Sequence, residues 1–357
     1  MGVEERHGRS EGLGPWEAIV GNPPYQLMTG GANASARPIY PHFVDLAEAM
    51  APRSACLVMP ARWYAGGGRA LDGFRAHMLD HPHLRELHDF PDTGDCFAGV
   101  NIRGGVCCVL VDAGHDASTG LTRVTTHRGG SSSSVSRPMR IAGIDAFVRS
   151  WEAKRILDRV AGDLARGSME GHVAGRTLFG IPSGVTGTEA FADSPDGMAH
   201  PVGCHARGRR FGYVERAMVT CGDAEVDAWK VFAPRANNIG TELRDDNLNS
   251  FVGRPGEVST SAYVAIGCDL GLDGDGAEAL ARYLRTRFAR ALHSLAKSSQ
   301  DLVPRTMRLV PEQDFSASSD IDWSGPLDAI DEQLFDKYGL DADERAFVRG
   351  LVGPMGG

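Results

Sequence analysis

Hydrophobic and polar positions along residues 16–111 predict strands and helices in alternation. We expect strands at 16–20, 55–59, 84–90 and 105–111, and helices at 41–51 and 71–79. In the second of these helices Phe74 and Met78 fall on one face, because residues four apart are neighbours on a helix. Strands that alternate with helices are typical of a doubly wound α/β sheet.

The pattern changes after residue 117. Residues 118–138 are polar, and Gly129-Gly130 followed by four serines is the most linker-like stretch in the chain. We therefore expect a first domain at 1–117, a linker at 118–143, a second domain at 144–315 and a tail at 316–357.

The second half shows a different arrangement of elements. We expect an amphipathic helix at 146–160, short strands separated by Gly and Pro between 171 and 315, and a long helix at 277–295. Two short helices are expected in the tail, at 326–338 and 341–352. This mixture predicts an α+β domain without an internal repeat.

Composition is that of an ordinary globular protein. Of the 357 residues 42% are hydrophobic and 23% charged, which allows two packed domains. The longest apolar runs, at 55–59 and 106–111, are far below the roughly 20 residues that cross a bilayer, so we expect a cytoplasmic protein without a membrane partner. The seven cysteines lack the paired spacing of a zinc site and are expected to be reduced thiols.

Four histidines, His77, His81, His83 and His88, lie close together in the sequence. Cysteine or carboxylate partners at the spacing of metal ligands are missing around them, so we expect no metal site.

The formal net charge of -9 argues weakly against a nucleic-acid partner, because Lys and Arg are needed to neutralise phosphates. Arginines nevertheless cluster at 207–210 and 282–290, so a basic surface on an acidic protein is compatible with the sequence. Most such runs are solvated faces, and the clustering alone decides nothing.

The tetrapeptide Asn22-Pro23-Pro24-Tyr25 follows a predicted strand, where open α/β sheets form their binding sites. The Asn22 side-chain oxygen and the Pro23 carbonyl can accept the two hydrogens of an exocyclic amine and favour a pyramidal nitrogen. Tyr25 can stack on a base that has left the duplex. The alternative interpretation is a Pro-Pro turn with an Asn cap and an aromatic plug.

The chain resembles the adenine-specific (N6) DNA methyltransferases of type IIG restriction-modification systems, with a Taq-like target-recognition region behind the catalytic half. Besides the tetrapeptide, the resemblance rests on segments that follow in the expected order: 57–63, 74–75, 89–97, 104–106, 229–231, 255–258, 283–288 and 337–340. It implies a partial Rossmann-like class I methyltransferase sheet in 1–117 and an α+β DNA target-recognition domain in 144–315. It also implies methyl transfer from S-adenosylmethionine to a flipped adenine in double-stranded DNA, with Asn22, Pro23, Pro24 and Tyr25 as the catalytic residues.

The sequence departs from this class in one respect. Members carry a glycine-rich S-adenosylmethionine loop and an acidic ribose contact before the tetrapeptide, whereas 21 residues precede Asn22 here. We therefore assign no cofactor-binding residue and expect a second polypeptide that carries the cofactor-binding half or a nuclease. Two alternatives stay open: a DNA-binding specificity and catalytic subunit that is inactive without this partner, and a methyltransferase that acts on RNA or on a protein glutamine.

Candidate DNA contacts are basic residues that follow strands or lie in the second domain. They are Arg62, Arg176, Lys230, Arg235 and Lys297. Arg62 follows a buried strand and can approach a phosphate or the flipped base, and the others can contact phosphates or base edges. For each of them a solvated surface side chain is the alternative interpretation.

Overall fold

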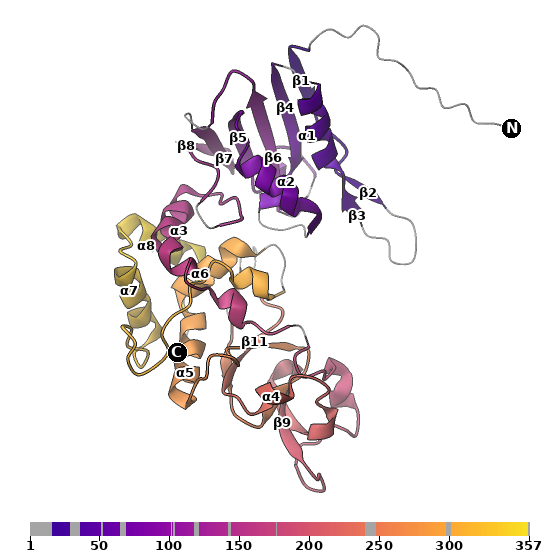
Figure 1. Ribbon diagram of the computed structural model, residues 1–357, viewed down its shortest axis with the longest axis vertical. Coiled ribbons are helices and arrows are strands. Elements are labelled where there is room, and N and C mark those ends of the chain that lie inside the picture. The colour runs from indigo at the N-terminus through magenta and orange to yellow at the C-terminus, as the bar shows by residue number, and fades with distance from the viewer. Residues whose placement is uncertain are drawn as a thin grey trace, which may run out of the picture. The chain divides into compact units, whose positions relative to one another are not determined.

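The computed structural model describes residues 16–28, 36–50, 53–64, 69–100, 102, 104–117, 121–141, 144–175, 177–239, 248–297 and 301–355. The chain divides into two units, which we describe separately (Figure 1). Unit 1 comprises residues 1–141 and 145–149, and unit 2 comprises residues 142–144 and 150–357.

Unit 1 contains a mixed sheet. Its strands among the described residues are β1 (Ala18–Gly21), β4 (Ser54–Pro60), β5 (Leu84–Phe90), β6 (Val106–Asp112), β7 (Thr122–Arg128) and β8 (Ser131–Arg137), in the order β1-β4-β6-β5-β7-β8. The pairs β1/β4 and β5/β7 are parallel, and β6 and β8 run antiparallel to their neighbours. A separate antiparallel pair consists of β2 (Gln26–Met28) and β3 (Ala36–Pro38).

Two helices, α1 (Tyr40–Ala49) and α2 (Arg69–Leu79), pack on this sheet (Figure 1). Val44 of α1 and Met78 of α2 belong to one buried cluster with Leu57, Met59 and other inward-facing strand residues. Both helices therefore cover the same face. The expected doubly wound arrangement, with helices on both faces, is not found in the described part of unit 1.

Several elements of unit 1 were predicted correctly. The strand at 84–90 has the expected bounds, and the helix expected at 71–79 is α2, which begins two residues earlier. Alternating burial along β4 agrees with the period of two that a strand requires.

The prediction of a linker at 118–143 was wrong for most of its length. The polar residues form β7 and β8, which pair from Thr122↔Arg137 to Arg128↔Ser131. Gly129 and Gly130 have φ values of 57° and 77°, which a two-residue type I′ hairpin turn requires at both positions. The glycine pair is therefore a tight turn within the sheet.

The described part of unit 2 contains helices and two three-stranded sheets. Its strands are β9 (Pro201–Ala206), β10 (Arg210–Glu215), β11 (Lys230–Pro234), β12 (Phe251–Gly253), β13 (Glu257–Ser259) and β14 (Tyr263–Ile266), arranged as β10-β9-β13 and β12-β11-β14. Its helices are α3 (Trp151–Leu164), α4 (Asp223–Val226), α5 (Gly274–Arg285), α6 (Arg287–Ala296), α7 (Leu327–Lys337) and α8 (Ala342–Leu351).

Two predicted helices of this unit differ from the structure. The helix expected at 146–160 begins at Trp151, because the Ser150 side chain accepts a hydrogen bond from the Ala153 amide and caps the first turn. The long helix expected at 277–295 is broken at Thr286, whose ψ of 151° is not helical. Its hydroxyl accepts from the Ala289 amide at 3.1 Å and thereby caps α6.

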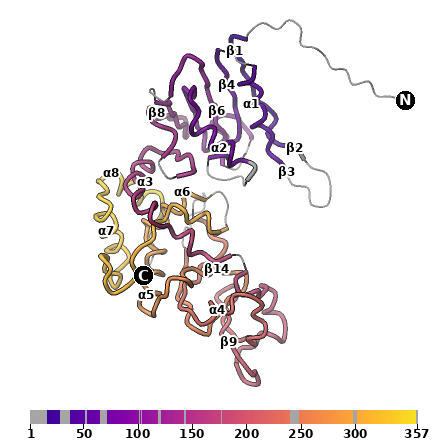
Figure 2. Tube along the Cα trace, in the orientation of Figure 1, coloured from indigo at the N-terminus to yellow at the C-terminus, as the bar shows by residue number. Residues whose placement is uncertain are grey.

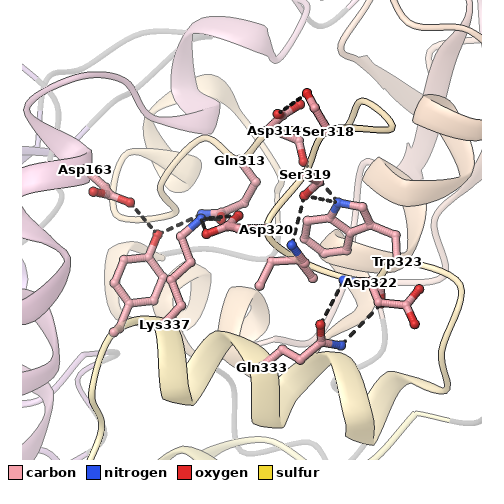
Figure 3. A network of polar contacts seen from close by, with 12 residues as sticks. Asp163, Gln313, Asp314, Ser318, Ser319, Asp320, Asp322, Trp323, Gln333 and Lys337 are labelled. Atoms are coloured by element: carbon pink, nitrogen blue, oxygen red, sulfur yellow. Dashed lines mark hydrogen bonds and ion pairs between the residues drawn. The ribbon is translucent and has the colours of Figure 1, made fainter.

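The expected helical tail is confirmed as α7 and α8, and polar contacts join it to the rest of unit 2 (Figure 3). The Tyr338 hydroxyl donates to Asp163 of α3 at 2.9 Å and accepts from Gln313 at 2.8 Å. Lys337 donates to Gln313 and Asp320 at 3.0 and 2.9 Å. The tail is thus part of unit 2 and not a free extension.

Among the described residues, none of the helices has the length and apolar character needed to cross a membrane.

Candidate functional site

The tetrapeptide lies at the carboxyl end of β1. That strand ends at Gly21, which pairs with Leu57 of the parallel strand β4. Asn22 and Pro24 are exposed, Pro23 is buried and Tyr25 is half-buried. The Tyr25 carbonyl accepts a hydrogen bond from the Ile39 amide at 3.1 Å, next to the β2/β3 pair. The backbone after the prolines is therefore anchored, while the Asn22 side chain remains accessible.

Three further segments reach the same edge of the sheet. Pro60 at the end of β4 and Phe90 at the end of β5 both pair with Val106, where β6 begins. The Ala61 amide donates to the Gly105 carbonyl at 3.0 Å. Gly105 has a φ of 81°, and a Cβ there would lie 2.2 Å from the Phe90 carbonyl oxygen. Glycine is required at this position because the two backbones pass so closely.

Behind this edge lies a cluster of buried aromatic side chains, which we call the aromatic cluster: Tyr40, Trp63, Tyr64, Phe74 and Phe147. The Trp63 ring lies 4.8 Å from that of Tyr64 and 5.8 Å from that of Phe74, in edge-to-face contacts. The hydroxyls of Tyr40 and Tyr64 and the Trp63 indole nitrogen are buried without a hydrogen-bond partner among the described residues. Such groups are normally satisfied, by protein, ordered water or a ligand.

Tyr25 connects the tetrapeptide to this interior. Its hydroxyl is buried, and burial raises its pKa, as do the nearby thiols of Cys96 and Cys107. The Asn22 side chain acts on the pKa of Tyr25 in the opposite direction, although the geometry between them does not make a hydrogen bond. The hydroxyl end of Tyr25 is therefore buried, close to Asn22.

A buried ion pair lies beside the aromatic cluster. Asp89, in β5, is 0% exposed, and burial raises its pKa. The Arg149 guanidinium opposes this shift, with its Nε 3.2 Å from an Asp89 carboxylate oxygen. Arg149 also donates to the Gly104 carbonyl and lies 5.0 Å from the centre of the Tyr64 ring. It thus ties the segment before β6 to the end of β5.

This arrangement suits recognition of a planar group that carries an amine. Asn22 offers an exposed acceptor and Tyr25 a half-buried aromatic ring. Sequence reasoning assigned no role to Tyr40, Tyr64 or Arg149. The position of Tyr40 at the start of the helix after the tetrapeptide was a usable signal, whereas nothing in the spacing of Arg149 indicated its place.

The candidate DNA contacts fall into different environments. Arg62 is exposed and lies in the 3₁₀ turn Ala61–Tyr64 that follows β4, at the same edge as Asn22. Arg176 lies outside the described residues. Arg235 is half-buried at the end of β11.

Lys230 does not fit a DNA contact, which corrects that prediction. Its side chain is 0% exposed, and its ammonium donates to the carbonyls of Val226, Glu225 and Arg254 at 2.8, 2.9 and 3.4 Å. Burial lowers the pKa of Lys230 to about 8. The ammonium holds α4 and the turn after β12 together inside unit 2.

Lys297 is half-buried and also has internal partners. It donates to the backbone carbonyl of Asn237 at 2.9 Å and to the side-chain oxygen of the same residue. Burial lowers the pKa of Lys297 to about 8. A DNA contact by Lys297 would require these bonds to be shared or exchanged.

Comparison with known proteins relates the first part of the chain to DNA modification enzymes. Residues 11–97 match the family model of the Eco57I restriction-modification methylase. An uncharacterized adenine-specific methylase of Mycoplasma pneumoniae is 28% identical over 110 residues, which are 30% of this chain and 26% of that relative. The chain thus spans about a quarter of the length of this relative.

Solved structures of restriction-modification enzymes also resemble the chain, at a low level. The type IIL enzyme MmeI in complex with DNA aligns over 94% of this chain and 55% of its own, with 10% identity and a TM-score of 0.41. The DrdV–DNA complex aligns over 95% of this chain and 44% of its own, with 11% identity and a TM-score of 0.39. These scores are too low to support an argument about fold or function, so the similarity that counts is the one in the first part of the sequence.

Proposed function

We propose that the chain is the catalytic and target-recognition portion of a site-specific DNA adenine-N6 methyltransferase of a restriction-modification system. One observation carries the proposal. The tetrapeptide Asn22-Pro23-Pro24-Tyr25 lies at the carboxyl end of a parallel strand, within the segment that matches a restriction-modification methylase family. Ligands of open α/β sheets bind at this edge.

In the proposed reaction the adenine amine attacks the methyl carbon of S-adenosylmethionine. A nitrogen–carbon bond forms while the sulfur–carbon bond of the donor breaks, and the amine then releases a proton. The Asn22 side-chain oxygen and the Pro23 carbonyl accept the two amine hydrogens, which makes the nitrogen lone pair available. Tyr25 stacks on the extruded base and offsets part of the cost of unstacking, a few kcal/mol.

The unpaired side of strand β1 favours the presence of further strands, which would bind the methyl donor. Among the described residues β1 pairs only with β4, and Val20 in β1 is 81% exposed. Strands of a parallel sheet are usually covered on both faces and paired on both sides. We propose that β1, β4, β5 and β6 are one part of a Rossmann-like methyltransferase sheet. The residues that bind S-adenosylmethionine would then lie on strands beyond β1, in a separate polypeptide or another segment.

Unit 2 is proposed as the DNA target-recognition domain. Arg62 at the edge of the first sheet and Arg235 and Lys297 in unit 2 are the remaining described candidates for contacts with phosphates or bases. Because the net charge is -9, any DNA-binding surface must be a local cluster of cations. The DNA affinity should fall as the salt concentration rises, with a slope set by the number of these cations that contact phosphates.

The proposal is tested by incubating the chain with radiolabelled S-adenosylmethionine and DNA of high sequence complexity, followed by chromatography of the nucleosides. We expect N6-methyldeoxyadenosine in the presence of the donor-binding partner. The Asn22→Ala variant should lose activity at least about a hundredfold, the scale on which removing one transition-state hydrogen-bonding group acts. Gln26→Ala, an exposed amide just after the tetrapeptide, is the matched control and should retain activity.

A calorimetric titration of the chain with S-adenosylmethionine separates the two forms of the proposal. Micromolar binding, about -8 kcal/mol, would show that the chain completes its own donor site. Absence of binding, with activity restored by the partner, would show that it is one part of a split enzyme. Label on RNA or on protein, with DNA unmodified, would refute the DNA substrate.

A further inference from the structure

Helices α1 and α2 both belong to unit 1 (Figure 2). Three ionisable side chains join them near their carboxyl ends. Glu48 lies in α1, His77 in α2, and His81 in the turn that follows α2. One carboxylate oxygen of Glu48 is 2.9 Å from His77 Nε2 and 3.0 Å from His81 Nε2. The sequence separates Glu48 from the histidines by 29 and 33 residues, so only the fold brings them together.

The three ligand atoms have the separation that a small metal ion requires. One atom from each residue, a ring nitrogen or a carboxylate oxygen, lies within 4.8 Å of the other two. Ligands bound to Zn²⁺ at about 2.0–2.1 Å in a tetrahedron are about 3.3 Å apart. The Glu48 oxygen, at 2.9 and 3.0 Å from the two nitrogens, is a few tenths of an ångström closer than that, and the nitrogens, at most 4.8 Å apart, would approach each other by up to about 1.5 Å. Two histidines four residues apart with a carboxylate form a donor set that Zn²⁺ accepts.

We propose that Glu48, His77 and His81 form a zinc site, with water as the fourth ligand. Glu48 approaches the two histidines from a different helix, which distinguishes this group from histidines that are merely close in sequence. His77 remains 41% exposed at its side chain, so the ion has a route from solvent.

The location separates the site from the tetrapeptide. His81 lies three residues before β5 begins at Leu84, whereas Asn22 follows the end of β1. Since β5 and the parallel strand β7 start at this edge, the site is at the opposite edge of the sheet from the tetrapeptide. An ion there would join α1 to α2 without taking part in methyl transfer, and the inference is independent of the proposed function.

The hydrogen bonding of His81 gives the proposal a specific consequence. The His83 amide donates to His81 Nδ1 at 3.0 Å, which leaves the proton of the neutral ring on Nε2, facing Glu48. When Nε2 binds the ion, that proton must move to Nδ1, and the His83 amide loses its acceptor. Binding should therefore change the amide resonance of His83 in an NMR spectrum.

The test is titration of the full chain with Co²⁺, whose tetrahedral complexes absorb visible light, followed by displacement with Zn²⁺. We expect one equivalent of Co²⁺ to bind, bleaching of the absorption by Zn²⁺, and a rise in the melting temperature of the protein, since a ligand of the folded state stabilises it. Failure of Co²⁺ and Zn²⁺ to bind, or an unchanged His83 amide on binding, would overturn the proposal.

Two variants locate the ion. Glu48→Gln and His77→Ala should each weaken binding by at least about tenfold, because removing even an indirect ligand contact has effects of 10–100-fold. His42→Ala is the matched control: His42 is an exposed histidine of α1 that pairs with Asp45 at 3.8 Å. Equal loss in the control, or full binding in both ligand variants, would place the ion elsewhere and refute the site. Methyl transfer should be unchanged in these variants, so a failure of the zinc proposal can be distinguished from a failure of the proposed function.

Discussion

Replacing Lys230 with methionine tests whether this lysine supports the fold of unit 2 instead of contacting DNA. Methionine keeps most of the length and volume of the side chain but removes the ammonium. Its close acceptors are the carbonyls of Val226 and Glu225, at the end of α4, where a helix leaves carbonyl groups without internal partners. The substitution leaves these buried acceptors unpaired.

The expected magnitude follows from two opposing effects. Each of the two short bonds from a charged donor contributes about 1.5–3 kcal/mol. Burial of the charge opposes them: the pKa of Lys230 falls from 10.5 to about 8, and at about 1.4 kcal/mol for each pKa unit this corresponds to roughly 3 kcal/mol. We therefore expect Lys230→Met to lower the free energy of unfolding by up to about 3 kcal/mol.

Urea denaturation of the full chain measures the loss of stability, and fluorescence anisotropy with a labelled duplex measures DNA affinity. The affinity of the folded Lys230→Met variant should stay within about twofold of the wild type, whereas Arg62→Ala, which removes an exposed cation, should weaken DNA binding without a change in stability. If Lys230→Met instead lost affinity tenfold at unchanged stability, the conclusion from its burial would be wrong.

Two further predictions concern the packing of each unit. Gly105→Ala should destabilise the protein by more than about 2 kcal/mol in urea denaturation, because its φ is 81° and the Cβ would lie 2.2 Å from the Phe90 carbonyl oxygen. Gly129→Ala, with φ 57° and no atom within 4 Å of the added Cβ, should cost about 1 kcal/mol. If the two variants lost the same stability, the close approach at Gly105 would not be the cause. Burial lowers the pKa of His293 to about 3, so the unfolded chain binds the extra proton first as the pH falls from 6.5 and stability is lost between pH 6.5 and 3. The loss should reach about 2 kcal/mol at pH 5. His293→Gln should reduce this slope of the unfolding free energy against pH, and an unchanged slope would show that His293 is not its source.

The elements that sequence patterns predicted best are those that carry several apolar side chains of their own. The apolar residues of α2 have helical spacing, so its type follows from local pattern. Those of β5, Leu84, Leu87 and Phe90, are three apart, and its pairing with β6 shifts register between Leu84 and Glu86. β8 has almost no apolar residue and is held mainly by backbone pairing with β7, which a pattern of side chains cannot reveal. The break between α5 and α6 was missed because it depends on one capping residue, Thr286. The amphipathic helical pattern continues on both sides of it.

The candidate site was predictable in its centre and not in its surroundings. The tetrapeptide carries its chemistry in four adjacent residues, and its place after a strand follows from the strand before it. The carboxylate that joins His77 and His81 comes from another helix, so the spacing of the histidines suggested no metal site. Lys230 was assigned to DNA by its residue type, although it precedes the apolar residues Val231 and Phe232, a position typical of a buried strand.

Unpartnered polar atoms give a reason, independent of the tetrapeptide, to place the site at this edge of the sheet. Leaving a buried donor or acceptor without a partner costs about 1–3 kcal/mol, and phenylalanine in place of Tyr40 or Tyr64 would avoid this cost at nearly the same volume. The chain instead has both hydroxyls and the Trp63 indole nitrogen buried inside unit 1. Departures from the most stable choice are expected where a protein binds or transforms something. Because the strand ends and these costly groups converge on one edge, a chance match to the tetrapeptide is a poorer explanation than a functional site.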